Sequence, residues 1–91
     1  MKFELVKATD GIHKYVGVFQ DGATIKFGSI GYEDYTQHKN PQRKTQYLVR
    51  HKSTEHWDDP QTRGALARWI LWNTPNLTHN IRKFKERFSL E

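Results

Sequence analysis

The chain has 91 residues, no cysteine and a formal net charge of +5 at pH 7. It can therefore form neither disulfides nor a cysteine-type zinc site, and no apolar run reaches the length of a membrane span. The N-terminal residues alternate in polarity and form no signal-peptide core, so we expect a non-secreted protein without a membrane partner. The length of the chain predicts a single domain spanning residues 1–91. The positive charge favours phosphate-rich or acidic partners, although a basic surface can also serve solubility alone.

Three segments near the N-terminus have the patterns of β-strands. Residues 3 to 7 alternate in polarity, as a short edge strand does. Residues 12 to 20 carry apolar side chains on both faces, which is typical of a central strand. Asp21 and Gly22 then predict a tight hairpin turn, and residues 23 to 27 form the returning strand. We therefore expect a three-stranded antiparallel sheet.

Residues 28 to 40 show no sustained period, so we expect an unusually long loop. Long loops in small domains are often functional, and this one contains Tyr32, Tyr35, His38 and Lys39, whose side chains can bind ligands or take part in chemistry. The alternative is a packed surface loop whose aromatic rings cap the sheet.

The three prolines predict three helices. Each follows a polar residue that can cap a helix: Asn40-Pro41, Asp59-Pro60 and Thr74-Pro75. We expect helices over residues 41 to 52, from residue 60 to 73, and over residues 75 to 88. The last helix has an apolar stripe and a cationic back.

The middle helix is the most hydrophobic segment of the chain. Leu66, Trp69 and Ile70 share one face, and Leu71 and Trp72 widen it. Because each tryptophan can bury roughly 150–250 Å², we expect this helix to form the core. The predicted fold class is α+β, a three-stranded antiparallel N-terminal sheet packed against three C-terminal helices.

Basic and aromatic residues are interleaved over the long loop and the first helix. These candidate nucleic-acid-binding residues are Tyr35, His38, Lys39, Arg43, Lys44, Tyr47 and Arg50. Cations can neutralise phosphates and tyrosine rings can stack on bases. The alternative is that the charges form only a solvated face.

Enzyme motifs are few. His51, Glu55, His56 and Asp58 are close in sequence, but their spacing matches no established zinc motif, so we expect no metal and no other cofactor. No glycine-rich phosphate loop opens a helix, and no serine lies in a nucleophile-elbow context. We therefore expect neither acyl-transfer chemistry nor a small-molecule substrate.

Many residues at fixed spacing resemble a family of small uncharacterised proteins encoded by nucleocytoplasmic large DNA viruses. They are Phe27-Gly28, Gly31-Tyr32, Asp34-Tyr35-Thr36, His38-Lys39, Arg43-Lys44, Tyr47, Arg50-His51, Trp57, Asp59-Pro60, Thr62, Gly64-Ala65-Leu66 and the run from Arg68 to Asn73. The resemblance implies a viral origin and a role in virion structure or genome handling. It supplies no activity that can be assigned to particular residues.

A second, looser resemblance is to the GIY-YIG nucleases, through residues 11 to 15 and 25 to 29. It would give Tyr15 the role of a catalytic tyrosine, Arg43 or Arg50 that of the arginine, and Glu55 that of the metal-binding carboxylate. However, the first motif has His13 where the family has a tyrosine, and the second has Phe27 directly before Gly28. We therefore expect no nuclease activity.

Together these patterns predict a small, non-enzymatic protein that binds nucleic acid, above all DNA, or acidic protein surfaces, and the first resemblance implies that it is a DNA-virus protein. We expect it in the virion or the host-cell interior. The alternative is a minor structural protein of the virion that contacts other virion proteins.

Overall fold

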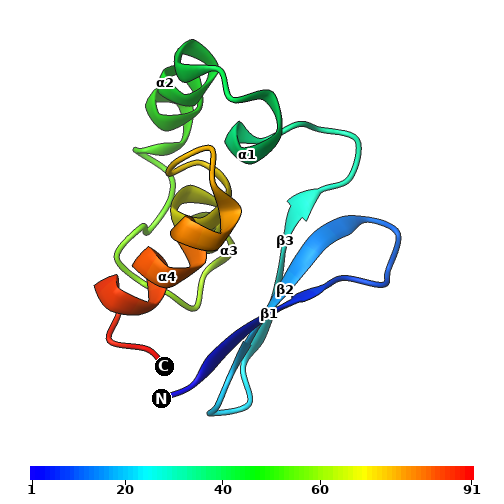
Figure 1. Cartoon of the computed structure of the whole chain (residues 1–91), viewed down its shortest axis with the longest axis vertical. Coiled ribbons are helices and arrows are strands. Elements are labelled where there is room, and N and C mark those ends of the chain that lie inside the picture. Colours follow the sequence, from blue (N-terminus) through cyan, green and yellow to red (C-terminus); the bar gives the residue numbers. More distant parts are fainter.

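The computed structural model describes residues 1–91 and has two layers, with the helices on one side of a β-sheet (Figure 1). The strands are β1 (Phe3–Lys7), β2 (His13–Phe19) and β3 (Thr24–Ser29). The helices are α1 (Tyr35–His38), α2 (Pro41–His51), α3 (Arg63–Leu66), its π-helical continuation η1 (Ala67–Leu71) and α4 (Leu77–Arg87). The predicted fold class, a three-stranded antiparallel sheet followed by packed helices, is confirmed.

The sheet has the order β1-β2-β3, with every pair antiparallel and β2 in the centre as predicted. The turn after β2 contains Gly22 at φ 95°, a conformation that glycine adopts without steric cost. The chain ends meet at the outer edge of β1, where Phe3 N–H donates to the Glu91 carbonyl over 2.9 Å. Figure 1 shows the two termini side by side.

The central helix, formed by α3 and η1, packs against β3 and α4 and supplies much of the core, as predicted. Leu66, Ile70 and Leu71 are fully buried. Trp69 and Trp72 are only half-buried and pack against this cluster, so aliphatic side chains and not the tryptophans form its fully buried centre.

The predicted starts of the central helix and of α4 are wrong, because the residue expected as each cap forms a turn before the helix. The central helix begins at Arg63 and is capped by Thr62, because the Asp59 side chain instead accepts a hydrogen bond from Gln61 N–H in a preceding turn. Helix α4 begins at Leu77 and is capped by Asn76. The polar residue before each proline therefore forms a turn and does not cap the helix.

Helix α2 begins as predicted, because the Asn40 side chain accepts from the amides of Gln42 and Arg43 and Pro41 occupies the first turn. The preceding segment is not one continuous loop over residues 28 to 40, as we expected. It contains the short helix α1, whose start is fixed by a capping box between Asp34 and Gln37. None of the helices is long and apolar enough to cross a membrane.

Candidate functional site

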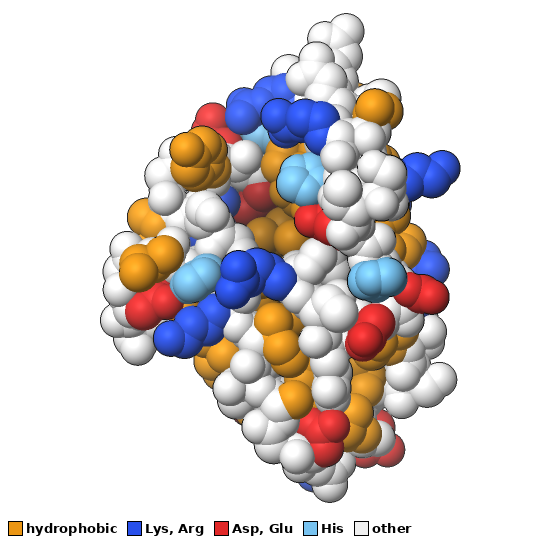
Figure 2. Space-filling model, turned by 180° about the vertical axis from the view of Figure 1, so that it is seen from behind, with side chains coloured by type: hydrophobic (Ala, Val, Ile, Leu, Met, Phe, Trp, Pro, Cys, Tyr) orange, Lys and Arg blue, Asp and Glu red, His pale blue; other side chains and the backbone are white.

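A cleft of about 430 Å³ opens beneath α2, which we call the α2 cleft. Its walls come from α2, the segment from Ser29 to Asp34, and the central helix. Figure 2 shows it as a hollow with apolar side chains inside and Lys or Arg side chains on both sides. The cleft therefore joins the predicted basic helix to residues from distant parts of the chain.

Small side chains form the floor of the α2 cleft. Gly64, Ala67 and Leu71 of the central helix line it, and Gly28 closes the end near the sheet. A Cβ atom at Gly28 would lie 3.0 Å from Leu71 Cδ1, and its φ is +75°. Both the space and the backbone conformation therefore require glycine at this position.

One wall of the cleft belongs to a column of stacked rings. The Trp72 and Tyr47 rings are parallel, with an interplanar angle of 2° and centroids 4.2 Å apart. The His51 ring stacks on Tyr47, and the His38 ring contacts Trp72, with Tyr35 beyond it. This column joins α1 and α2 to the end of the central helix.

The aromatic column changes the roles of the two predicted tyrosines. Tyr35 and Tyr47 are both buried, so neither ring presents a free face on which a base could stack. Burial also raises the pKa of Tyr47 well above its usual range. The sequence-based expectation that these two rings stack on nucleic-acid bases is therefore corrected; they hold the fold together.

His38 is likewise part of the structure. Its Nδ1 accepts a hydrogen bond from Asn40 N–H over 2.9 Å, while Nε2 is enclosed without a hydrogen-bond partner. Burial lowers the pKa of His38, with a smaller contribution from the Arg43 charge. The environment of the ring thus favours its neutral form, and the ring packs against Trp72.

Lys44 also points inward. Its ammonium donates to the backbone carbonyl of Asn73 and lies 5.4 Å from the centroid of the Tyr35 ring. Burial lowers the pKa of Lys44, and the nearby Arg68 charge adds to the effect. Its predicted role as a phosphate contact is corrected, because the ammonium is already bound to the Asn73 carbonyl.

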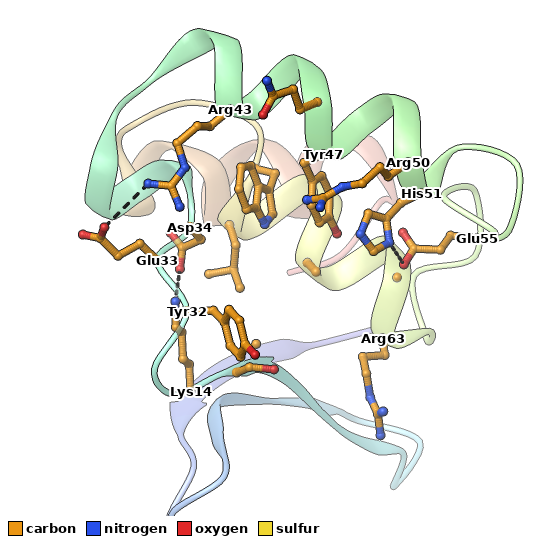
Figure 3. A pocket seen from close by; sticks show the side chains of 17 residues that line it. Lys14, Tyr32, Glu33, Asp34, Arg43, Tyr47, Arg50, His51, Glu55 and Arg63 are labelled. Carbon is orange, nitrogen blue, oxygen red and sulfur yellow. Dashed lines mark hydrogen bonds and ion pairs between the residues drawn. The ribbon is translucent and has the colours of Figure 1, made fainter.

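Three predicted cations remain exposed: Lys39, Arg43 and Arg50. Figure 3 shows Arg43 and Arg50 projecting from α2 over the cleft. Arg43 has only a loose ion pair with Glu33, at 3.6 Å, and Arg50 has no carboxylate partner. These two guanidinium groups are therefore available to an anion at the mouth of the cleft.

Other charged groups in the cleft are already paired. Lys14 Nζ lies 2.7 Å from the buried Asp34 carboxylate. One Glu55 oxygen is 2.9 Å from His51 Nδ1, and the other accepts from the Trp57 indole, also over 2.9 Å. These contacts fix the charged walls and leave Arg43, with its loose ion pair, and Arg50 as the more accessible cations.

The structure brings only part of each enzyme-like pattern together. His51 and Glu55 bind each other, and no group of three or more potential metal-ligating side chains gathers anywhere in residues 1–91. Arg43, Arg50 and Glu55 line the α2 cleft, but Tyr15 does not; its ring packs against Phe27, and burial raises its pKa.

The predicted nucleic-acid-binding residues leave out two residues of the cleft, Tyr32 and Arg63. Tyr32, at the mouth of the cleft, has 77% of its surface exposed, and Arg63 lies on the side opposite α2 (Figure 3). The sequence marks Tyr32 as a loop side chain able to bind ligands, but it does not reveal that the ring faces two arginines. Nothing in the sequence marks Arg63, whose guanidinium is anchored to the Lys26 carbonyl over 3.2 Å.

Comparison with known proteins identifies a family but no function. Residues 3–51, more than half of the chain, match the model of a family of unknown function, DUF5754. No curated protein and no solved structure matches the sequence. The matched segment covers the whole sheet, α1 and α2. The expected membership of a small uncharacterised family is thus confirmed, while the viral origin stays a prediction: the chain belongs to the family of unknown function DUF5754.

Proposed function

We propose that this protein binds nucleic acid, without catalysing a reaction on it, through the mouth of the α2 cleft. The observation that carries the proposal is the convergence of Arg43, Arg50 and the exposed Tyr32 at one opening. Guanidinium groups match the geometry of phosphate oxygens, and an exposed ring can stack on a base.

The balance of charge in the cleft supports an anionic ligand. The lining has four cations, Lys14, Arg43, Arg50 and Arg63, against the three carboxylates of Glu33, Asp34 and Glu55. Asp34 is paired with Lys14, and Glu55 is bonded to His51 and Trp57, so Glu33 is the one lining carboxylate that forms an ion pair with an arginine at the mouth. The exposed Lys39, just before α2, adds to the positive charge of this end of the molecule.

The resemblance to proteins of large DNA viruses suggests the setting. We propose a DNA-virus protein that acts in the virion or the host-cell interior, with the viral genome as its main partner. A second candidate function is a structural one, in which the protein contacts other virion proteins. It is favoured by Ile12 and Ile30, two exposed apolar side chains on segments joined by a backbone hydrogen bond of 3.0 Å.

A salt titration of binding tests the proposal. We expect the purified protein to bind labelled oligonucleotides, with log affinity falling linearly as log salt rises, because bound phosphates release counterions. The double variant Arg43→Glu, Arg50→Glu should weaken binding to every sequence and reduce the salt slope by about one for each phosphate that the protein no longer binds.

The matched control makes the same charge change on α4. Arg82 and Lys83 are both exposed there and do not line the cleft, so Arg82→Glu with Lys83→Glu should leave most of the affinity intact. An equal loss of affinity in the two double variants would show that net charge alone drives binding. Absence of binding to any oligonucleotide at low salt would overturn the proposed function.

A further inference from the structure

We infer that the α2 cleft holds one unpaired nucleotide, so that the protein's ligand is single-stranded nucleic acid. This inference rests on the proposed function and adds the class of nucleic acid. It follows from the position of Tyr32, the size of the cleft and the arrangement of side chains along α2.

Tyr32 offers the ring on which a base could stack. The other three tyrosines are buried or half-buried, and the three tryptophans are half-buried. Tyr32 instead follows Gly31, whose φ of 96° turns the chain, and stands exposed at the mouth of the cleft. An aromatic ring that folding leaves uncovered in a cleft lined by arginines is typical of the stacking platforms of single-strand-binding proteins.

The size of the cleft favours one nucleotide over a duplex. Its volume of about 430 Å³ lies in the lower part of the range for small-molecule sites, roughly 300–1,000 Å³. Bases inside a duplex are stacked on one another and expose only their edges in the grooves, so none can place its face on Tyr32. An unpaired base can leave the stack and enter.

The side chains along α2 suit the rest of the nucleotide. Arg43, Gln46 and Arg50 all line the cleft and are spaced by three and four residues, so they lie on one face of the helix. The two arginines can bind phosphates on either side of the bound base. Gln46, between them, carries an amide donor and acceptor that can pair with a base edge.

The test compares a single-stranded oligothymidylate with a duplex of equal length, using variants at Tyr32. We expect the single strand to bind at least about tenfold more tightly than the duplex at the same salt concentration. Tyr32→Ala should lower single-strand affinity on the order of tenfold, because the base no longer has a ring on which to stack. Tyr32→Phe keeps the ring and should retain the affinity.

Two further measurements separate stacking from charge and from misfolding. Tyr32→Ala should leave the salt slope unchanged, whereas Arg43→Glu with Arg50→Glu should flatten it. Because Tyr32 is exposed, the melting temperature of the alanine variant should also stay unchanged. The inference would be overturned if the protein bound single strand and duplex with equal affinity and Tyr32→Ala left the affinity unchanged. The proposed function would then still stand. Tighter binding of polyglutamate than of any oligonucleotide would overturn both.

Discussion

Helices α2 and α4 look alike in sequence but have different roles in the structure. Each has 11 residues, an asparagine N-cap and basic residues in its last turn. Helix α4 buries Asn80 and Phe84, whereas α2 buries only Tyr47 and lies at the end of the molecule far from the termini (Figure 1). Similar amphipathic patterns therefore belong to a core helix in one case and to the cover of a cleft in the other.

The two helices are also attached differently. The Asn80 amide of α4 donates to the carbonyls of Ile70 and Thr74, both over 2.8 Å, and its oxygen accepts from the Thr74 amide. Helix α2 is attached mainly through the stacking of Tyr47 on Trp72 and the bond from Lys44 to Asn73. Because it buries fewer side chains, α2 should open more readily than α4.

The largest effect is expected from removing the core side chain of α4. Phe84 is 1% exposed and packs against Phe3 and Phe88, with ring centroids 4.9 and 5.0 Å away. Phe84→Ala should lower the free energy of unfolding by about 3–5 kcal/mol, measured by urea denaturation. Phe84→Leu refills much of the space and should cost less. A decrease below about 1 kcal/mol for the alanine variant would show that α4 is not a core helix.

A smaller and more local effect is expected from the corresponding change in α2. Tyr47→Ala removes the ring between Trp72 and His51, so it should cost about 2 kcal/mol and expose the α2 amides to hydrogen exchange before those of α4. Tyr47→Phe should be nearly silent, because the hydroxyl makes no hydrogen bond within the protein. Uniform loss of protection across both helices would contradict the difference in attachment.

The smallest expected effect is a dependence of folding stability on pH, caused by His38 beside α2. Because burial lowers the pKa of His38 below 6.5 in the folded state, folding favours the neutral ring. This stabilisation is fully present above about pH 6.5 and should be lost as the pH falls from there through the lower, folded-state pKa. Thermal melting between pH 7 and pH 5 measures it.

His38→Asn provides the control, because its amide oxygen can still accept from Asn40 N–H but does not titrate in this range. The variant should flatten the stability profile between pH 7 and pH 5. An unchanged slope of stability against pH in this variant would assign the effect to another group.

Asp10 affects stability in a different pH range. Hydrogen bonds from His13 lower the pKa of Asp10, so the stability that this carboxylate contributes is lost only below about pH 4.

Much of the fold could be predicted because its signals are local. Alternating polarity identified β1, apolar side chains on both faces identified β2, and the Asp21-Gly22 turn identified β3. Asn40-Pro41 identified the start of α2. The starts of the central helix and α4 were missed because more than one nearby residue could act as the cap. Sequence alone cannot decide between Thr62 and Asp59, since each side chain binds the backbone of a different turn.

The candidate site was predictable only in part. The sequence pointed to α2 and to Lys39, Arg43 and Arg50, which the structure leaves exposed. It could not distinguish these from Lys44, which has the same chemistry but donates to the carbonyl of Asn73, 29 residues later. Nor could it identify Tyr32 as the free ring when Tyr35 lies three residues away.

By itself the sequence determined the order of the elements, the central position of β2 and the apolar stripe of α4, because each depends on side-chain spacing within one segment. Only the tertiary structure decided which basic and aromatic side chains stay accessible. That outcome depends on Trp72, whose ring covers Tyr47 and His38 from a distant part of the chain. Burial by a residue remote in sequence leaves no trace in the local pattern, so the cleft and its free arginines emerge only on folding.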